Sequence, residues 1–107
     1  MNNKFSDLSW LGNAKNDVIK IVGIRAVCQK NLSDADFEGV NLSDVDFTGV
    51  AIIGANLKNT NAKIDPQKVW GRTLRDGNFE GLDFSEASFT GVIIDGANLK
   101  NSLQNLL

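Results

Sequence analysis

The sequence ANLKN stands at residues 55–59 and again at residues 97–101, 42 positions later. The identity extends around it, because residues 37–59 and 79–101 share 15 of 23 residues, including FEG, FTGV and GANLKN. The chain therefore contains an internal duplication. A repeat of this kind has to be identified before any single helix or strand is assigned.

Each copy has a shorter period of five residues, as in ADFEG VNLSD VDFTG VAIIG ANLKN. The third residue of each pentad is large and apolar, whereas amphipathic helices and half-buried strands have periods of 3.6 and 2. The five-residue spacing of these apolar residues continues along the chain if two extra residues form a bulge at residues 60–61 and again at residues 102–103. The predicted pentad centres are Val22, Val27, Leu32, Phe37, Leu42, Phe47, Ile52, Leu57, Ile64, Val69, Leu74, Phe79, Phe84, Phe89, Ile94, Leu99 and Leu106.

Four pentads, each a short extended step followed by a turn, close a square circuit of 20 residues. Successive circuits then stack with the centres pointing inward. The corners need residues that tolerate a positive φ, and Gly, Asp and Asn are the best suited. The predicted corner residues are Asp34, Gly39, Asp44, Gly49, Gly54, Asn59, Gly71, Asp76, Gly81, Gly91, Gly96 and Asn101.

The pentads ADFEG and ANLKN resemble those of the pentapeptide-repeat family, specifically over residues 31–59 and 74–101. The resemblance implies an all-β fold, a right-handed quadrilateral β-helix, here of about four coils over residues 20–107. Residues 1–19 are predicted to form a short N-terminal helical cap, with Ser6 as the N-cap and Gly12 as the stop, because an open stack end needs covering. Docking of this segment elsewhere is the alternative.

Most pentads carry a small residue two positions before the centre. Burying an unpaired charge there is costly, so the corners that carry long polar side chains must open to water. Residues 62–73, with Pro66, form either a regular coil side or a protruding loop. The exceptional side chains are Lys20, Arg25, Lys30, Gln67, Arg72 and Gln104.

The composition limits the possible functions. The 11 basic and 13 acidic residues give a net charge of −2, which argues against direct binding of nucleic acid or of an anionic membrane. The single cysteine, Cys28, and the lack of a long apolar segment predict a soluble, cytoplasmic protein. Histidine is absent, so we predict no catalytic residue, no metal site, no cofactor and no enzymatic activity.

Three surface features are candidates for binding. A column of alternating charge, Glu38, Lys58, Glu80 and Lys100, predicts an ion-pair ladder. An apolar patch is predicted at Ile53, Trp70 and Ile93, either covered by the N-terminal segment or open to a partner. Acidic side chains form a possible partner-binding face, or else bond to turn amides. These acidic residues are Asp34, Asp36, Glu38, Asp44, Asp46, Asp83 and Glu86.

The C-terminal residues Leu103, Leu106 and Leu107 fall where a circuit is incomplete, which predicts a homodimer joined through this end. We predict a non-catalytic scaffold or protein-interaction module. The family resemblance implies an alternative, an acidic DNA mimic that binds a type II topoisomerase (gyrase) in the manner of quinolone-resistance proteins. That role suits a long acidic rod, whereas four coils span only roughly 20 Å.

Overall fold

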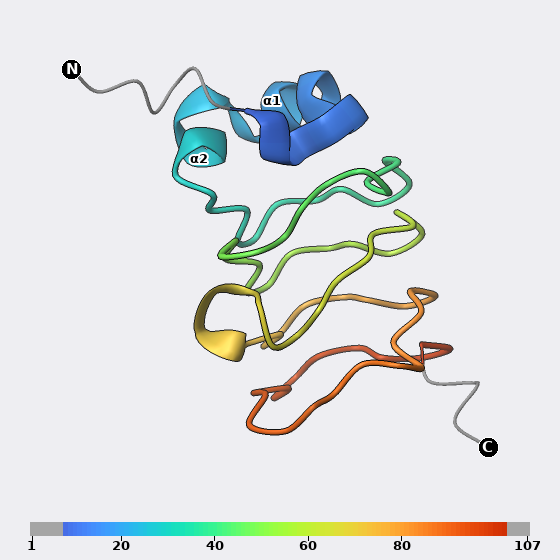
Figure 1. Cartoon of the computed structure of the whole chain (residues 1–107). Coiled ribbons are helices and arrows are strands. Elements are labelled where there is room, and N and C mark those ends of the chain that lie inside the picture. Colours follow the sequence, from blue (N-terminus) through green and yellow to red (C-terminus); the bar gives the residue numbers. More distant parts are fainter. Residues whose placement is uncertain (1–7, 103–107) are drawn as a thin grey trace.

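A computed structural model describes residues 8–102, and Figure 1 shows a helical segment at one end of a stack of coils. The helical segment consists of the 3-10 helix η1 (Ser9–Ala14) and the α-helices α1 (Lys15–Val22) and α2 (Ile24–Cys28). A short 3-10 turn, η2 (Trp70–Arg72), lies within the coils.

The predicted all-β fold, a right-handed quadrilateral β-helix, is wrong. Residues 8–102 contain no strand or sheet, and Val22 and Val27, which we expected in the coils, lie in helices. A strand needs consecutive paired residues, but each pentad turns before a second residue can pair. The coils therefore touch through isolated parallel bridges: Asn31–Ala51, Asp36–Asn56, Asn56–Asn78, Thr73–Ile93 and Asn78–Asn98.

The corners are turns closed by a hydrogen bond to the pentad centre. The N–H of Val40 donates to the C=O of Phe37 (2.8 Å), and the N–H of Leu82 donates to the C=O of Phe79 (3.0 Å). The predicted corner residues have a positive φ, with the exception of Asp44. The third residue of such a turn has a positive φ, which favours Gly or Asn. The residue type at the end of each pentad therefore determines where the chain turns.

The duplication of 42 residues exceeds two circuits of 20 residues by two, and the backbone pairing accommodates these two extra residues at η2. Gly49 donates its N–H to the C=O of Lys68, 19 positions later, whereas Gly54 donates to Arg75, 21 positions later. The backbone pairing therefore gains two residues between Lys68 and Arg75, where η2 projects from the side of the stack (Figure 1).

Residues 62–73 combine a coil side with this projecting turn. Ile64 and Val69 are buried, as expected of pentad centres, and Pro66 is buried beside them. Arg72 is exposed and has a φ of 48°, so the corner opens where a charged side chain has to reach water.

The helical segment covers the first coil. Trp10, Leu11 and Val18 are buried, and the C=O of Trp10 accepts a 2.7 Å hydrogen bond from the N–H of Asp46. Gly12 is not the helical stop that we predicted. It forms a kink (φ 56°, ψ −135°) from which the helical path continues. Ser6 lies outside the described residues.

The core runs from this lid through the stack. Every predicted centre from Val27 to Phe84 is buried. In the last coil Phe89 and Leu99 are only half-buried and Ile94 is 44% exposed, while Leu106 lies outside the described residues. Within residues 8–102 the core is therefore closed at the helical end and open at the opposite end.

Candidate functional site

A surface groove of about 930 Å³ separates two neighbouring coils on one side of the stack, between residues 61–67 and 81–88. Its apolar floor is formed by Ala62, Ile64 and Leu82, which are all buried. Its rim is polar and mainly acidic. The ionisable rim residues are Lys63, Asp65, Asp83 and Glu86.

The groove exists because backbone pairing between the coils is interrupted here. Within residues 8–102 the N–H groups of Ala62, Lys63 and Ile64 have no hydrogen-bond acceptor. A side chain replaces the missing ladder, since Gln67 Nε2 donates to the C=O of Ser88 (3.0 Å) and of Thr90 (2.8 Å). The coils thus stay linked at one edge of the groove and separate along it.

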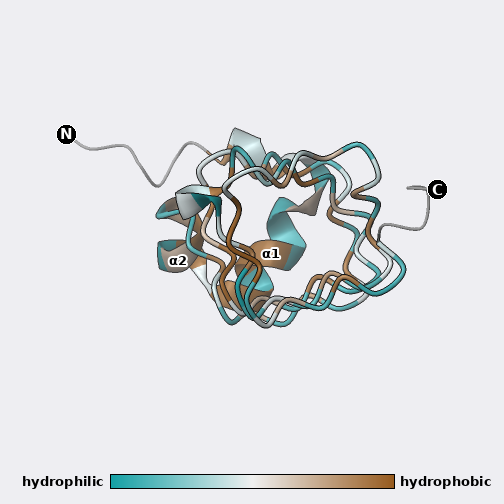
Figure 2. Cartoon of the chain, turned by 90° about the horizontal axis from the view of Figure 1, so that it is seen from below, coloured by the Kyte–Doolittle hydropathy of each residue, from teal (hydrophilic) through white to brown (hydrophobic). Residues whose placement is uncertain are grey.

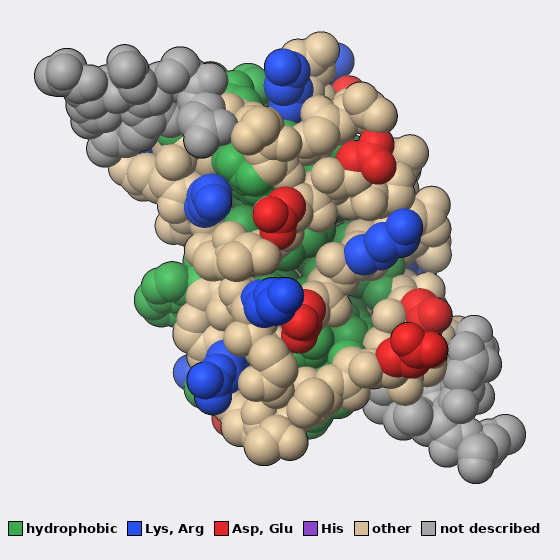
Figure 3. Space-filling model, viewed as in Figure 1, with side chains coloured by type: hydrophobic (Ala, Val, Ile, Leu, Met, Phe, Trp, Pro, Cys, Tyr) green, Lys and Arg blue, Asp and Glu red, His purple; other side chains and the backbone are tan. Residues whose placement is uncertain are grey.

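The acidic residues predicted to form one face lie on several different surfaces of the structure. Asp83 and Glu86 line the groove, whereas Asp36 and Glu38 lie beside Asn56 on another side. Asp44 accepts a 2.7 Å hydrogen bond from Asn13 of the lid. Asp34 occupies a left-handed corner, and Asp46 pairs with the lid backbone. Figure 3 shows basic and acidic side chains interspersed over the visible face.

Several of these carboxylates bond to turn amides, as the alternative interpretation proposed. Asp36, Asp46 and Asp83 each accept the N–H two residues later, in the same way as Asn56 and Asn78 do. Bonds from the Ser85 hydroxyl and then the Ser85 N–H lower the pKa of Asp83. The Thr48 N–H and then the Thr48 hydroxyl lower the pKa of Asp46. These aspartates therefore stabilise corners in their ionised form.

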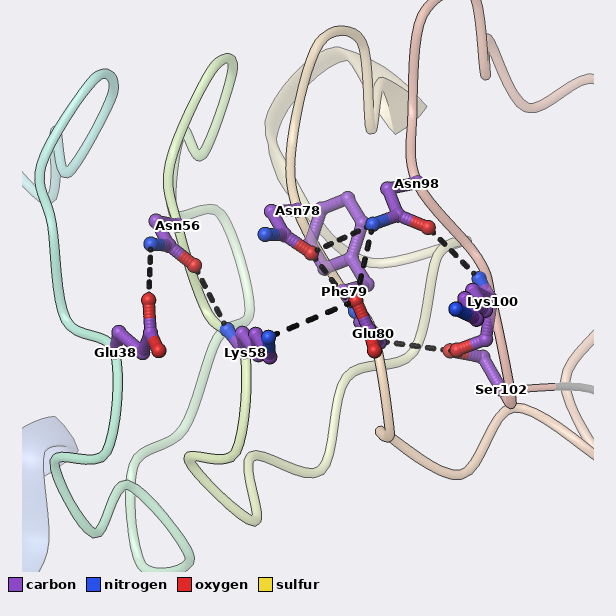
Figure 4. Close-up of polar contacts among 9 residues, drawn as sticks. All are labelled: Glu38, Asn56, Lys58, Asn78, Phe79, Glu80, Asn98, Lys100 and Ser102. Carbon is purple, nitrogen blue, oxygen red and sulfur yellow. Dashed lines mark hydrogen bonds and ion pairs between the residues drawn. The ribbon is translucent and has the colours of Figure 1, made fainter.

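A ladder of amide side chains, which the sequence reasoning missed, joins the coils on another side (Figure 4). Asn56 Nδ2 donates to Asp36 Oδ1 (3.1 Å). Figure 4 shows that it also donates to Glu38 Oε1 (3.2 Å) and that Asn98 Nδ2 donates to Asn78 Oδ1 (3.2 Å). We call Asp36, Asn56, Asn78 and Asn98 the amide ladder. The signal was present, since these residues recur immediately before the pentad centres.

The predicted ion-pair ladder is formed in one place among residues 8–102, where Lys58 Nζ lies 3.9 Å from Glu80 Oε1. Two buried hydroxyl groups were also missed. Thr60 Oγ1 donates to the C=O of Leu57 (2.7 Å), and Ser102 Oγ donates to the C=O of Phe79 (2.7 Å; Figure 4). Thr60 and Ser102 occupy equivalent places in the duplication, which is the signal that identifies them.

The members of the predicted apolar patch differ in exposure. Trp70 is 56% exposed on η2, Ile93 is 46% exposed in the last coil, and Ile53 is only partly exposed. Thr73, which bridges to Ile93, and the exposed Arg75 lie on the coil between Ile53 and Ile93. The patch is therefore interrupted by polar residues.

The open end of the stack, formed by Phe89, Ile94 and Leu99, is the second apolar surface. Figure 2 shows the stack from this end, with the coils superimposed and the lid helices on the far side. The predicted dimer residues Leu103, Leu106 and Leu107 lie outside the described residues.

Comparison with known protein families identifies the family of this chain. The pentapeptide-repeat family matches residues 31–63 and 73–103, with eight copies of the repeat. This match covers more than half of the chain, so the chain belongs to the pentapeptide-repeat family, and the match supports a repeat-protein scaffold. The comparisons with curated proteins and with solved structures find no match.

Neither a metal site nor a bilayer-spanning helix is found in the described part of the chain. Residues 8–102 contain no group of three Cys, Asp or Glu residues arranged to hold a metal ion. The helices within the same range are too short and too polar to span a bilayer. Cys28 is a free, half-buried thiol in α2.

Proposed function

We propose that this chain is a non-catalytic scaffold for protein interactions that acts as a homodimer joined through the open end. The exposed apolar surface of the last coil carries this proposal. The centres of the other coils are buried, yet Ile94 is 44% exposed and Phe89 and Leu99 are only half-buried. A solvent-exposed core section of this kind is typical of a surface that a partner covers.

A second copy of the chain fits the open end. A two-fold axis brings the same apolar surface from both subunits together, so each side chain meets an apolar surface of equal size. Covering a large aliphatic or aromatic side chain contributes about 1.5–3 kcal/mol. The lid already covers the opposite end through Trp10, Leu11 and Val18, so among the described residues the exposed part of the core lies at this end.

Light scattering at tens of micromolar tests the dimer. We expect the wild-type chain to have twice the monomer mass and Ile94→Asp to have the monomer mass, because a carboxylate cannot be buried unpaired at the interface. Ile24→Asp is the matched control, since Ile24 is equally exposed (44%) but lies in α2 on the lid. A monomeric wild type, or equal loss of the dimer in both variants, contradicts the proposal.

A scaffold role agrees better with the surface than the gyrase-binding DNA mimic. The carboxylates are divided among the groove, the amide ladder and the lid contact, and Lys58 is paired with Glu80 between them. A DNA mimic needs a continuous acidic surface. We expect micromolar protein to leave gyrase supercoiling unchanged. Inhibition or protection of the enzyme in that assay would favour the mimic.

A further inference from the structure

The groove between residues 61–67 and 81–88 has the properties of a peptide-binding site. Its volume of about 930 Å³ is in the range of ligand sites, and it combines a buried apolar floor with a polar rim. The side chains of Ala62, Ile64 and Leu82 form a floor on which an apolar side chain can pack.

The chain segment 62–64, whose side chains contribute to this floor, has unpaired backbone groups. Ala62 and Ile64 are 5% and 8% exposed, yet their N–H groups have no acceptor within residues 8–102, and the C=O groups of residues 62–64 have no donor there. Backbone groups in such poorly exposed residues are nearly always hydrogen-bonded. An extended peptide satisfies them by adding its own backbone alongside, which is a common mode of peptide recognition.

The charge of the rim indicates the kind of peptide. Three carboxylates, from Asp65, Asp83 and Glu86, face one ammonium group, from Lys63. Asp65 and Asp83 each accept the N–H two residues later, so their positions are held by the turns. Side chains on one side of an extended peptide recur every second residue, about 7 Å apart, so alternate residues can reach the rim while the others face the floor.

We propose that the groove binds an extended, basic segment of a partner protein by backbone pairing with residues 62–64. The segment carries Lys or Arg at alternate positions toward Asp65, Asp83 and Glu86, and small apolar residues toward Ala62 and Leu82. This proposal rests on the proposed protein-interaction role and names its site. It does not depend on the dimer.

A fluorescein-labelled nonapeptide of alternating lysine and alanine is the probe, with fluorescence anisotropy measuring its binding to the full chain at low salt. The control peptide has the same sequence with alternate residues N-methylated, which removes backbone donors and preserves every charge. We expect the unmodified peptide to bind and the N-methylated peptide to bind at least about tenfold more weakly, because paired backbone groups carry the interaction. Equal binding of the two peptides overturns the proposal.

A double variant, Asp83→Asn with Glu86→Gln, tests the rim. Asparagine already accepts the turn N–H at the corresponding positions Asn41 and Asn78, so the corner survives the change. We expect the affinity to fall by roughly three- to thirtyfold, the effect of losing two exposed ion pairs. Asp17→Asn with Asp95→Asn removes the same charge at exposed sites outside the groove and serves as the control. A control effect as large as that of the rim variant overturns the proposal.

Amide resonances identify the site independently of affinity. Binding should shift the amides of Ala62, Lys63 and Ile64 and slow their hydrogen exchange, and shifts concentrated at the amide ladder instead would refute the groove. We expect Ile94→Asp to become monomeric and still bind the peptide, and the rim variant to remain dimeric. Failure of the groove proposal and failure of the dimer proposal are therefore distinguishable.

Discussion

The amide-ladder side and the groove side of the stack are built from the same pentads, but they differ in how neighbouring coils are joined. On the ladder side, the backbones of Asn56 and Asn78 and of Asn78 and Asn98 form bridges, and the Asn98 amide also donates to the Asn78 side chain. On the groove side, the hydrogen bonds that join residues 61–67 to residues 81–90 within the described part of the chain come from the side chain of Gln67. A regular period therefore produces a coil, whereas the residues flanking each centre decide whether two coils close against each other.

The chemical reason lies in the donors and acceptors that each side offers. An asparagine amide both donates and accepts, so identical residues stacked at successive coils can bond to one another. The groove side has Asp65, Pro66 and Asp83 at the corresponding corners. Ionised carboxylates only accept, and proline lacks an N–H, so stacked residues of these types cannot form such a ladder.

The largest expected effect is loss of core packing on the ladder side. Phe79 is fully buried and its ring packs edge to face on Phe84, with 5.8 Å between the centroids. We expect Phe79→Ala to reduce the free energy of unfolding by about 3–5 kcal/mol, measured by urea titration. Ile64→Ala, at the groove floor, should cost only about 2 kcal/mol, since the removed atoms border an existing groove. Equal costs would show that the two sides are packed alike.

The next effect comes from overpacking at Gly77. A Cβ atom added there would lie 2.5 Å from the Phe79 ring, although the φ of Gly77 is not left-handed. We expect Gly77→Ala to cost about 1–3 kcal/mol in thermal or urea unfolding, because the ring must move from its position. Ala87→Ser on the groove lining, which is half-buried beside open space, should change stability by less than about 1 kcal/mol. The reverse order would contradict this difference in packing.

A smaller effect distinguishes the corner side chains of the two sides. Asn78 accepts the N–H of Glu80 and a bond from the Asn98 amide, whereas the bonds of Asp83 within residues 8–102 stay in its own corner, with Ser85. We expect Asn78→Ala to lower the free energy of unfolding by about 1–2 kcal/mol and Asp83→Ala to lower it by less, because only the first change breaks a link between coils. Hydrogen exchange of the Asn98 region should quicken in the first variant alone.

The smallest expected effect is a pH dependence confined to carboxylate corners. The pKa of Asp83 in the folded chain lies below its ordinary value of 3.8, so its bonds to Ser85 persist above that value and are lost as the pH falls through the lowered pKa. Amide resonances should show the Ser85 N–H shifting below pH 3.8, while the Glu80 N–H, bonded to Asn78, shifts far less. Asp83→Asn should abolish the Ser85 transition. If the Ser85 transition persists in this variant, a titrating group other than Asp83 causes it.

Prediction from the sequence succeeded where the information is local. Phe37 and Leu57 lie at pentad centres and are buried, and Gly39 and Asn59 at the pentad ends have the positive φ that a corner requires. It failed for the fold class, and it did not anticipate how the candidate site residues are arranged. The acidic residues were expected on one face but are divided among several surfaces, and Gln67 appeared only as an exception to the repeat.

The repeat phase, the buried centres and the corners follow from the amino-acid sequence, because they depend on residues within one pentad. Three other features arise only when whole coils pack: the coils meet at isolated bridges rather than in strands, the extra residues project at η2, and helices extend to Cys28 over the first coil. Those outcomes depend on backbone groups about 20 residues apart. Whether such groups align is settled by the packing of whole coils, and a period of five residues holds no information about it.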